Sequence, residues 1–121
     1  MTPLGAKLRE IRARRNISLK EMAQGLNISS AYLSALEHGK RGKPTWYLLQ
    51  RMIAFFNIIW DEAEELQRLA EISDPNITIN TGGMAPEATE LTNRLAKEIN
   101  TLSPKTLEHL KNEIIRHSAK K

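Results

Sequence analysis

The sequence contains no cysteine, few aromatic residues and no long apolar run. Without cysteine, disulfide bonds, thiolate metal ligands and a cysteine nucleophile are excluded. Aromatic residues make up only 5% of the chain, which favours a helical core of Leu, Ile, Ala and Met over a strand-rich core. The longest apolar stretch, residues 53–60, is interrupted by Asn57 and is too short to span a membrane. We therefore expect an all-α protein of the cytoplasm, without a signal peptide.

What the sequence does have is an uneven distribution of charge. Residues 1–45 contain nine Lys and Arg against three acidic residues, whereas residues 46–75 contain two against six. Residues 76–121 hold seven basic and five acidic residues, which completes the net charge of +4. A polyanion would approach the basic end and be repelled by the acidic one, so the pattern favours one orientation on nucleic acid.

Capping signals and apolar spacing predict five short helices within residues 1–73. Thr2-Pro3 is typical of a helix start, and apolar residues then recur at helical spacing over residues 3–15. Ser18 followed by Glu21 forms a capping box for a second helix over about 18–25. The next predicted N-caps are Ser29, Thr45 and Asp61, the last in a capping box with Glu64 and preceded by Trp60 as a hydrophobic staple. We expect Trp46, Trp60, Phe55 and Phe56 to belong to the core or to a partner surface.

The remainder of the chain predicts a linker and a helical extension. Residues 76–80 alternate polar residues with Ile, so one short strand remains an option there, which would need a partner such as its twin in a dimer. Pro86 and Pro104 each open a helix with a narrow apolar stripe. We expect a DNA-binding domain over 1–73, a linker over 74–86 and a dimerisation or partner-binding extension over 87–121. The predicted dimerisation residues are Leu91, Leu95, Ile99, Leu102, Leu107, Leu110 and Ile114.

Residues 17–44 combine two short helices, a tight turn and a basic loop. The predicted helix over 29–37 has small and polar residues on one face, and Leu33 and Leu36 on the other. Small residues allow a helix to approach a groove closely, while Ser can hydrogen-bond base edges and Ala can contact a thymine methyl group. The candidate DNA-facing residues of this helix are Ser29, Ser30, Ala31, Ser34 and Ala35.

Basic residues flank this helix on both sides in the sequence. Lys20, Lys40, Arg41 and Lys43 are expected to neutralise phosphates beside the groove. Ser18 and Ser29 lie at predicted helix N-termini, where free backbone N–H groups suit a phosphate.

These residues resemble the Xre/Cro-type helix-turn-helix of phage repressors and many bacterial regulators. The resemblance covers about residues 4–72 and rests on Ser18-Leu19-Lys20-Glu21-Met22-Ala23, Gly25-Leu26-Asn27-Ile28, Ser29 to Leu33, Leu36-Glu37-His38-Gly39-Lys40-Arg41 and Pro44. It implies that the helix over 29–37 enters the major groove, where Ser30, Ala31 and Ala35 would read bases. It further implies that Tyr32 lies nearer the DNA backbone and that Arg12 and Glu37 form a structural ion pair.

The predicted recognition helix departs from the family pattern in one respect. It lacks the Gln, Asn and Arg side chains that make bidentate contacts to bases. Direct readout by this helix is therefore expected to be weak, with more weight on DNA shape or on other residues.

The sequence favours a sequence-specific transcriptional regulator, and we expect a nucleoid-associated repressor that binds a pseudo-palindromic site as a homodimer. The alternative is an antitoxin that neutralises a toxin through residues 76–118 and autoregulates its operon. We predict no cofactor, no metal and no enzymatic activity, because no catalytic set of residues emerges. A metal site at His109, Glu113 and His117, which recur every four residues, is the weaker interpretation of that helix.

Overall fold

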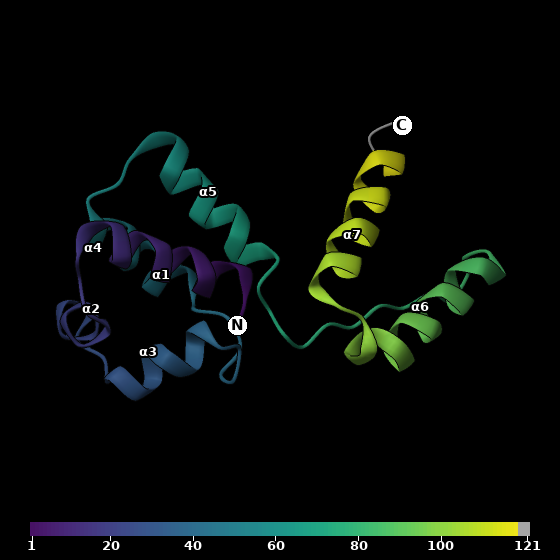
Figure 1. The fold of residues 1–121 in the computed structure, drawn as a ribbon, viewed down its shortest axis with the longest axis horizontal. Coiled ribbons are helices and arrows are strands. Elements are labelled where there is room, and N and C mark those ends of the chain that lie inside the picture. Colours follow the sequence, from purple (N-terminus) through teal and green to yellow (C-terminus); the bar gives the residue numbers. More distant parts are fainter. Residues whose placement is uncertain (119–121) are drawn as a thin grey trace. The chain divides into compact units, whose positions relative to one another are not determined.

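The computed structural model describes residues 1–118 and confirms the all-α architecture (Figure 1). The chain separates into two compact units, Met1–Ile77 and a segment that begins at Thr78. The helices are α1 (Pro3–Arg15), α2 (Leu19–Leu26), α3 (Ser30–Glu37), α4 (Trp46–Phe56), α5 (Trp60–Glu71), α6 (Pro86–Glu98), the short 3₁₀ helix η1 (Ile99–Thr101) and α7 (Pro104–Ser118). None of these helices is long and apolar enough to cross a membrane.

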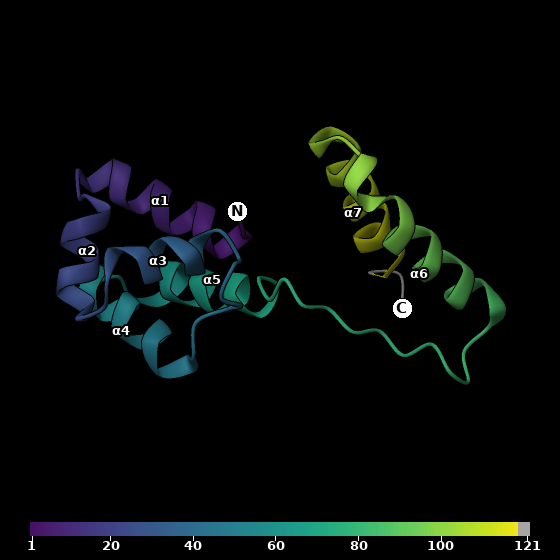
Figure 2. The ribbon, with the colours of Figure 1, turned by 90° about the horizontal axis from the view of Figure 1, so that it is seen from below.

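The first unit is built around one apolar core. Each of its five helices presents apolar residues at three- and four-residue intervals, so that one face of every helix points inward. Helix α1 packs against both α3 and α5, while α4 packs against α2 and α5 (Figures 1 and 2). Fully buried side chains from the five helices are Leu8, Met22, Leu33, Phe56 and Leu66.

Hydroxyl side chains cap the first four helices, as the sequence predicts. The side-chain oxygens of Thr2, Ser18, Ser29 and Thr45 each accept a hydrogen bond from the backbone N–H three residues later, at 3.0–3.1 Å. At Ser18 the Glu21 carboxylate accepts the Ser18 N–H at 3.0 Å, so the predicted capping box is confirmed. Each bond satisfies a donor that the helix itself leaves free, which fixes where the helix begins.

The prediction that the fifth helix starts from a cap at Asp61 is wrong. Helix α5 begins two residues earlier than this cap would place it, at Trp60, and its N-cap residue Ile59 makes no side-chain capping bond. Asp61 therefore lies within the first turn, and its predicted capping box with Glu64 does not form. Trp60 has a left-handed backbone with φ 55° and is 78% exposed, so it is not a hydrophobic staple either.

The four aromatic residues predicted for the core or a partner surface divide between a pair that packs in or against the core and an exposed pair. Phe56 is fully buried and Phe55 packs against the core from its edge. Trp46 and Trp60 are 72% and 78% exposed, which removes both from the core. The two tryptophans are the first residues of α4 and α5.

The optional strand over residues 76–80 does not form. This segment pairs with no strand among residues 1–118, and Ile77 and Ile79 are exposed. Alternation alone does not make a strand, because a strand needs a neighbouring strand to satisfy its backbone groups.

The second unit is a pair of helices, α6 and α7, without a core. Helix α6 ends at Glu98 and passes through η1 into α7. No residue of the described part, 78–118, is buried, and only a few apolar side chains, such as Leu95, Leu102 and Leu107, are half-buried. The apolar stripes predicted for the two helices are therefore largely uncovered.

Candidate nucleic-acid interface

The junction between α2 and α3 is a tight turn at Asn27. Asn27 ends α2 with a left-handed backbone, φ 59°, and its N–H donates to the Gln24 carbonyl oxygen at 3.1 Å. The following N–H, of Ile28, donates to the Ala23 carbonyl oxygen at 3.0 Å. Asparagine tolerates this backbone region better than most residues, so the chain reverses within a few residues and α3 begins at Ser30.

The two faces of α3 differ in size and burial. Leu33 and Leu36 are buried in the core of the first unit. Helix α3 lies at the edge of that unit (Figure 1). On its other side Ala31 is exposed, and Ser30, Tyr32, Ser34 and Ala35 are half-buried. Apart from Tyr32, these side chains are small, so another surface can come close to the helix backbone.

The two serines expected at helix N-termini have different surroundings. Ser29 caps α3 through the Tyr32 N–H, and the first turn of α3 contains no acidic residue. At Ser18 the Glu21 carboxylate already accepts the local N–H, and this bond, with the Ser18 hydroxyl, lowers the pKa of Glu21. A phosphate at Ser18 would meet that carboxylate, so Ser29 is the better of the two positions for an anion.

The loop after α3 carries three exposed cations on a folded backbone. Its first residues bend back toward the helix, because the Lys40 N–H donates to the Ala35 carbonyl oxygen at 2.9 Å. Gly39 and Gly42 adopt φ 79° and 77°, which side chains with a Cβ rarely allow. The exposed cations of this loop are Lys40, Arg41 and Lys43, and Lys20 is exposed at the start of α2.

Arg12 and Glu37 form a buried ion pair between α1 and the end of α3. The Arg12 Nη2 donates to Glu37 Oε1 at 3.1 Å, and Arg12 Nη1 donates to the other carboxylate oxygen. Only 7% of Arg12 and 2% of Glu37 is exposed. Both side chains are thus unavailable for DNA and instead hold α3 against α1.

Backbone contacts that the sequence analysis missed strengthen the same junction. The Thr2 N–H donates to the Glu37 carbonyl oxygen at 3.0 Å, and Gly5 lies so close to this carbonyl that a Cβ there would overlap it. The buried Ser73 hydroxyl accepts the Leu4 N–H at 2.9 Å. The start of α1 therefore bridges the end of α3 and the end of the first unit. Gly5 is the one signal in the sequence for this contact, since glycine inside a helix is otherwise unfavourable.

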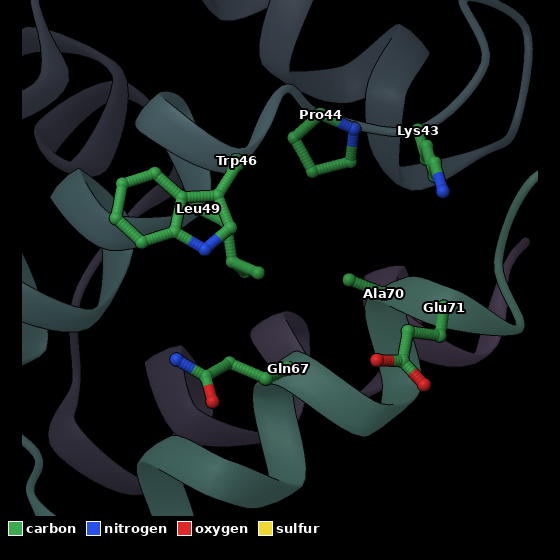
Figure 3. A pocket seen from close by; sticks show the side chains of 7 residues that line it. All are labelled: Lys43, Pro44, Trp46, Leu49, Gln67, Ala70 and Glu71. Atoms are coloured by element: carbon green, nitrogen blue, oxygen red, sulfur yellow. The ribbon is translucent and has the colours of Figure 1, made fainter.

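A shallow cleft of about 240 Å³ lies beside the basic loop (Figure 3). It is lined by Lys43, Pro44, Trp46, Leu49, Gln67, Ala70 and Glu71. Lys43 and Glu71 are the charged groups of this lining, and Gln67 adds an amide. Lys43 is exposed.

The metal interpretation of α7 is not supported. Among residues 1–118 no group of three His, Cys, Asp or Glu gathers to hold a metal ion. The Glu113 carboxylate instead pairs with Arg116 Nη2 at 2.6 Å, and His117 Nε2 lies 3.5 Å from the same oxygen. Helical spacing brings Glu113 close to Arg116 and His117, and its carboxylate forms a surface ion pair with Arg116.

The residues predicted for dimerisation all lie in the second unit. Leu91, Ile99, Leu110 and Ile114 are exposed, whereas Leu95, Leu102 and Leu107 are half-buried. Ile115, which the sequence analysis missed, is exposed next to Ile114 and adds to the uncovered apolar surface.

Comparison with known proteins gives two matches. A family model described as a helix-turn-helix domain matches residues 3–66, which include α2, the turn and α3. An uncharacterized HTH-type transcriptional regulator, RghRB of Bacillus subtilis (strain 168), is 34% identical over 61 residues. The matched segment is 50% of this chain and 44% of the relative, so the similarity spans less than half of the relative's length.

Proposed function

The chain belongs to the Xre-type helix-turn-helix family, and we propose that it is a sequence-specific DNA-binding transcriptional regulator. The observation that carries this proposal is the outer face of α3, where Ala31 is exposed among small side chains, together with the exposed cations Lys40, Arg41 and Lys43 of the loop that follows the helix. The relative RghRB, which carries the name of an HTH-type transcriptional regulator, supports the same function.

In the proposed complex α3 lies in the major groove of DNA. Ser30, Ala31 and Ala35 would contact base edges, with Ser34 beside them. The side chains that would contact the phosphates are Lys20, Lys40 and Lys43, with Ser29 and, more weakly, Ser18 at helix N-termini, while Tyr32 and Arg41 would lie at the same interface. Phosphate contacts fix the orientation of the protein, whereas base contacts select the sequence.

A charge placed on α3 tests this orientation. The substitution Ala31→Glu adds a carboxylate to an exposed position that would face the DNA, and we expect it to abolish binding to a fragment selected from a random DNA pool. Ala54→Glu is the matched control, because Ala54 is also an exposed helical alanine of the first unit but lies on α4. Gel-shift titrations of both variants give the result. If Ala31→Glu binds as tightly as Ala54→Glu, α3 does not enter the groove.

We further propose a homodimeric repressor. One recognition helix contacts only a few base pairs, which is too little to distinguish one site from the many competitors in a genome. Two copies would place two α3 helices about 34 Å apart on a pseudo-palindromic site. Occupation of promoter DNA is sufficient for repression, so such a dimer needs no additional contact and would reside on the nucleoid.

The second unit is the proposed dimerisation element, since its apolar side chains lack cover. Removing it should give a monomer with weakened binding to the operator. Light scattering of a fragment of residues 1–75 beside the full chain tests this, and a fragment that remains a dimer would contradict it.

The same exposed helices support a second candidate function, an antitoxin whose apolar face binds a toxin. The two candidates predict different oligomeric states for the full chain in the absence of any partner. A dimer by light scattering favours the regulator that acts without a further partner, whereas a monomer favours the antitoxin.

A further inference from the structure

Helix α3 presents no amide, guanidinium or free carboxylate group that could make a bidentate contact to a base. Its residues are Ser, Ala, Tyr, Leu, Ser, Ala, Leu and Glu, and the single carboxylate, Glu37, is buried against Arg12. Ser and Ala contact bases, but they discriminate less than a bidentate side chain does. If α3 lies in the major groove as proposed above, strong discrimination between base pairs must come from a neighbouring residue.

Arg41 is the neighbour that reaches back to α3. Its guanidinium carbon lies 5.7 Å from the centre of the Tyr32 ring, which is a cation–π contact. Arg41 belongs to the loop after α3, whereas Tyr32 lies in the first turn of the helix. The side chain therefore extends alongside α3 instead of away from it.

The backbone of the loop makes this direction possible. The Gly39 N–H donates to the Leu36 carbonyl oxygen at 3.3 Å, and the left-handed Gly39 and Gly42 turn the chain on either side of Lys40 and Arg41. Tyr32 is half-buried and packs against the core, so its ring offers a fixed surface. Arg41 itself is exposed, and within residues 1–118 no carboxylate lies within 4.0 Å of its guanidinium group.

We propose that Arg41 is the main specificity-determining residue and recognises a guanine in the major groove, with Tyr32 as its positioning residue. This proposal rests on the proposed DNA-binding function. A planar guanidinium group can donate two parallel hydrogen bonds to the O6 and N7 acceptors of guanine. Tyr32 limits the directions that the long Arg41 side chain can sample, which lowers the entropy lost when the two bonds form.

The test separates base recognition from phosphate contact. Sites are selected from a random DNA pool with the full wild-type chain, and affinity is then measured for the best site and for versions in which each guanine is replaced. For the guanine that Arg41 contacts, Arg41→Ala should reduce the preference over other bases by roughly 5- to 150-fold. Arg41→Lys should restore only part of it, because an ammonium group lacks the planar pair of donors.

Lys43→Ala is the matched control, since Lys43 is an exposed cation of the same loop. It should weaken all sequences alike and flatten the salt dependence by about one charge. Replacing the contacted guanine by 7-deazaguanine removes the N7 acceptor and should weaken the wild type while leaving Arg41→Ala unchanged. A uniform loss of affinity for Arg41→Ala, with an unchanged sequence preference, would overturn the proposal.

Two substitutions of Tyr32 test the positioning role. Tyr32→Phe keeps the ring and should retain the guanine preference, whereas Tyr32→Leu should lower it by about two- to fivefold. Thermal melting checks that both variants remain folded. If Tyr32→Leu keeps the full guanine preference, the positioning role is wrong. If the wild type selects no DNA sequence, the proposed function fails. If it selects a sequence and Arg41→Ala keeps the same preference, only the role of Arg41 fails.

Discussion

The two units of this chain use similar helices but differ in what those helices bury. In the unit Met1–Ile77, each of the five helices contributes at least one fully buried apolar side chain. In the described part of the second unit, 78–118, no side chain is buried, and Leu91, Ile114 and Ile115 are each more than half exposed. The first unit thus contains its own core, whereas the described part of the second leaves its apolar side chains uncovered.

This difference has an energetic meaning. Fully burying a Leu, Ile or Phe side chain contributes about 1.5–3 kcal/mol to the free energy of folding. Several side chains of the first unit make this contribution, and none of the described part of the second unit does. Helices of 13 and 15 residues, such as α6 and α7, are marginal in water without tertiary packing. We therefore expect the stability of the first unit to be intrinsic and that of the second to depend on association.

The largest expected effect follows from separating the units. A peptide of residues 78–121 should lose most of its helix on dilution, because its apolar stripes then have no partner. A fragment of residues 1–77 should keep its helix content at every concentration. Circular dichroism at 222 nm over a dilution series measures both. If the helix content of the 78–121 peptide does not change with concentration, the stability of the second unit does not depend on association.

Within the first unit, removing one member of the buried ion pair should have the next largest effect. Glu37→Ala leaves the Arg12 guanidinium buried without a carboxylate, which we expect to cost about 3–5 kcal/mol in the free energy of unfolding. The double variant Arg12→Met, Glu37→Leu should recover most of this loss, because no charge is then left unpaired.

Urea unfolding gives these free energies, with Glu64→Ala as the control. Glu64 pairs with Arg68 at 3.9 Å, but both side chains are about two-thirds exposed, so its removal should have little effect. A similar loss for Glu37→Ala and Glu64→Ala would show that burial of the pair does not determine its effect.

The sequence predicts the first unit well because its signals are local. Hydroxyl residues at four helix starts and apolar spacing are read within one or two turns, and the same signals identify the outward face of α3. The start of α5 was missed because Ile59 gives no capping signal. Ser73 could not be found, since its partner Leu4 is 69 residues away. The contact of Arg41 with Tyr32 depends on the path of a glycine-containing loop, which spacing does not define.

A matched pair of leucine truncations compares the two units directly. Leu66→Ala removes a fully buried side chain of α5 and should destabilise the first unit by about 2–5 kcal/mol. Leu110→Ala removes an exposed leucine of α7, so it should leave the unfolding of the first unit unchanged and instead weaken self-association. Urea unfolding and light scattering of both variants give the two readouts. Self-association that survives Leu110→Ala undiminished would remove this leucine from the dimer contact.

The smallest expected effect concerns acid sensitivity of the first unit, at the contact of α1 with α5. Arg14 Nη2 donates to Glu62 Oε2 at 2.8 Å. This hydrogen bond lowers the pKa of Glu62 below its ordinary value of 4.5, although partial burial acts in the opposite direction. The positive charges of Arg14, Lys7 and Arg15 lower it further. Because the folded state favours the charged form, the stability gained from Glu62 is complete above pH 4.5 and is lost as the pH falls through the lowered pKa. Glu62→Gln should therefore be less stable than the wild type at neutral pH, and the difference should shrink below pH 4.5.

Urea unfolding at several pH values measures this, with Glu90→Gln on α6 as the control outside the first unit. A stability difference that stays constant from neutral to acid pH would mean that the Glu62 charge is not what holds α1 to α5.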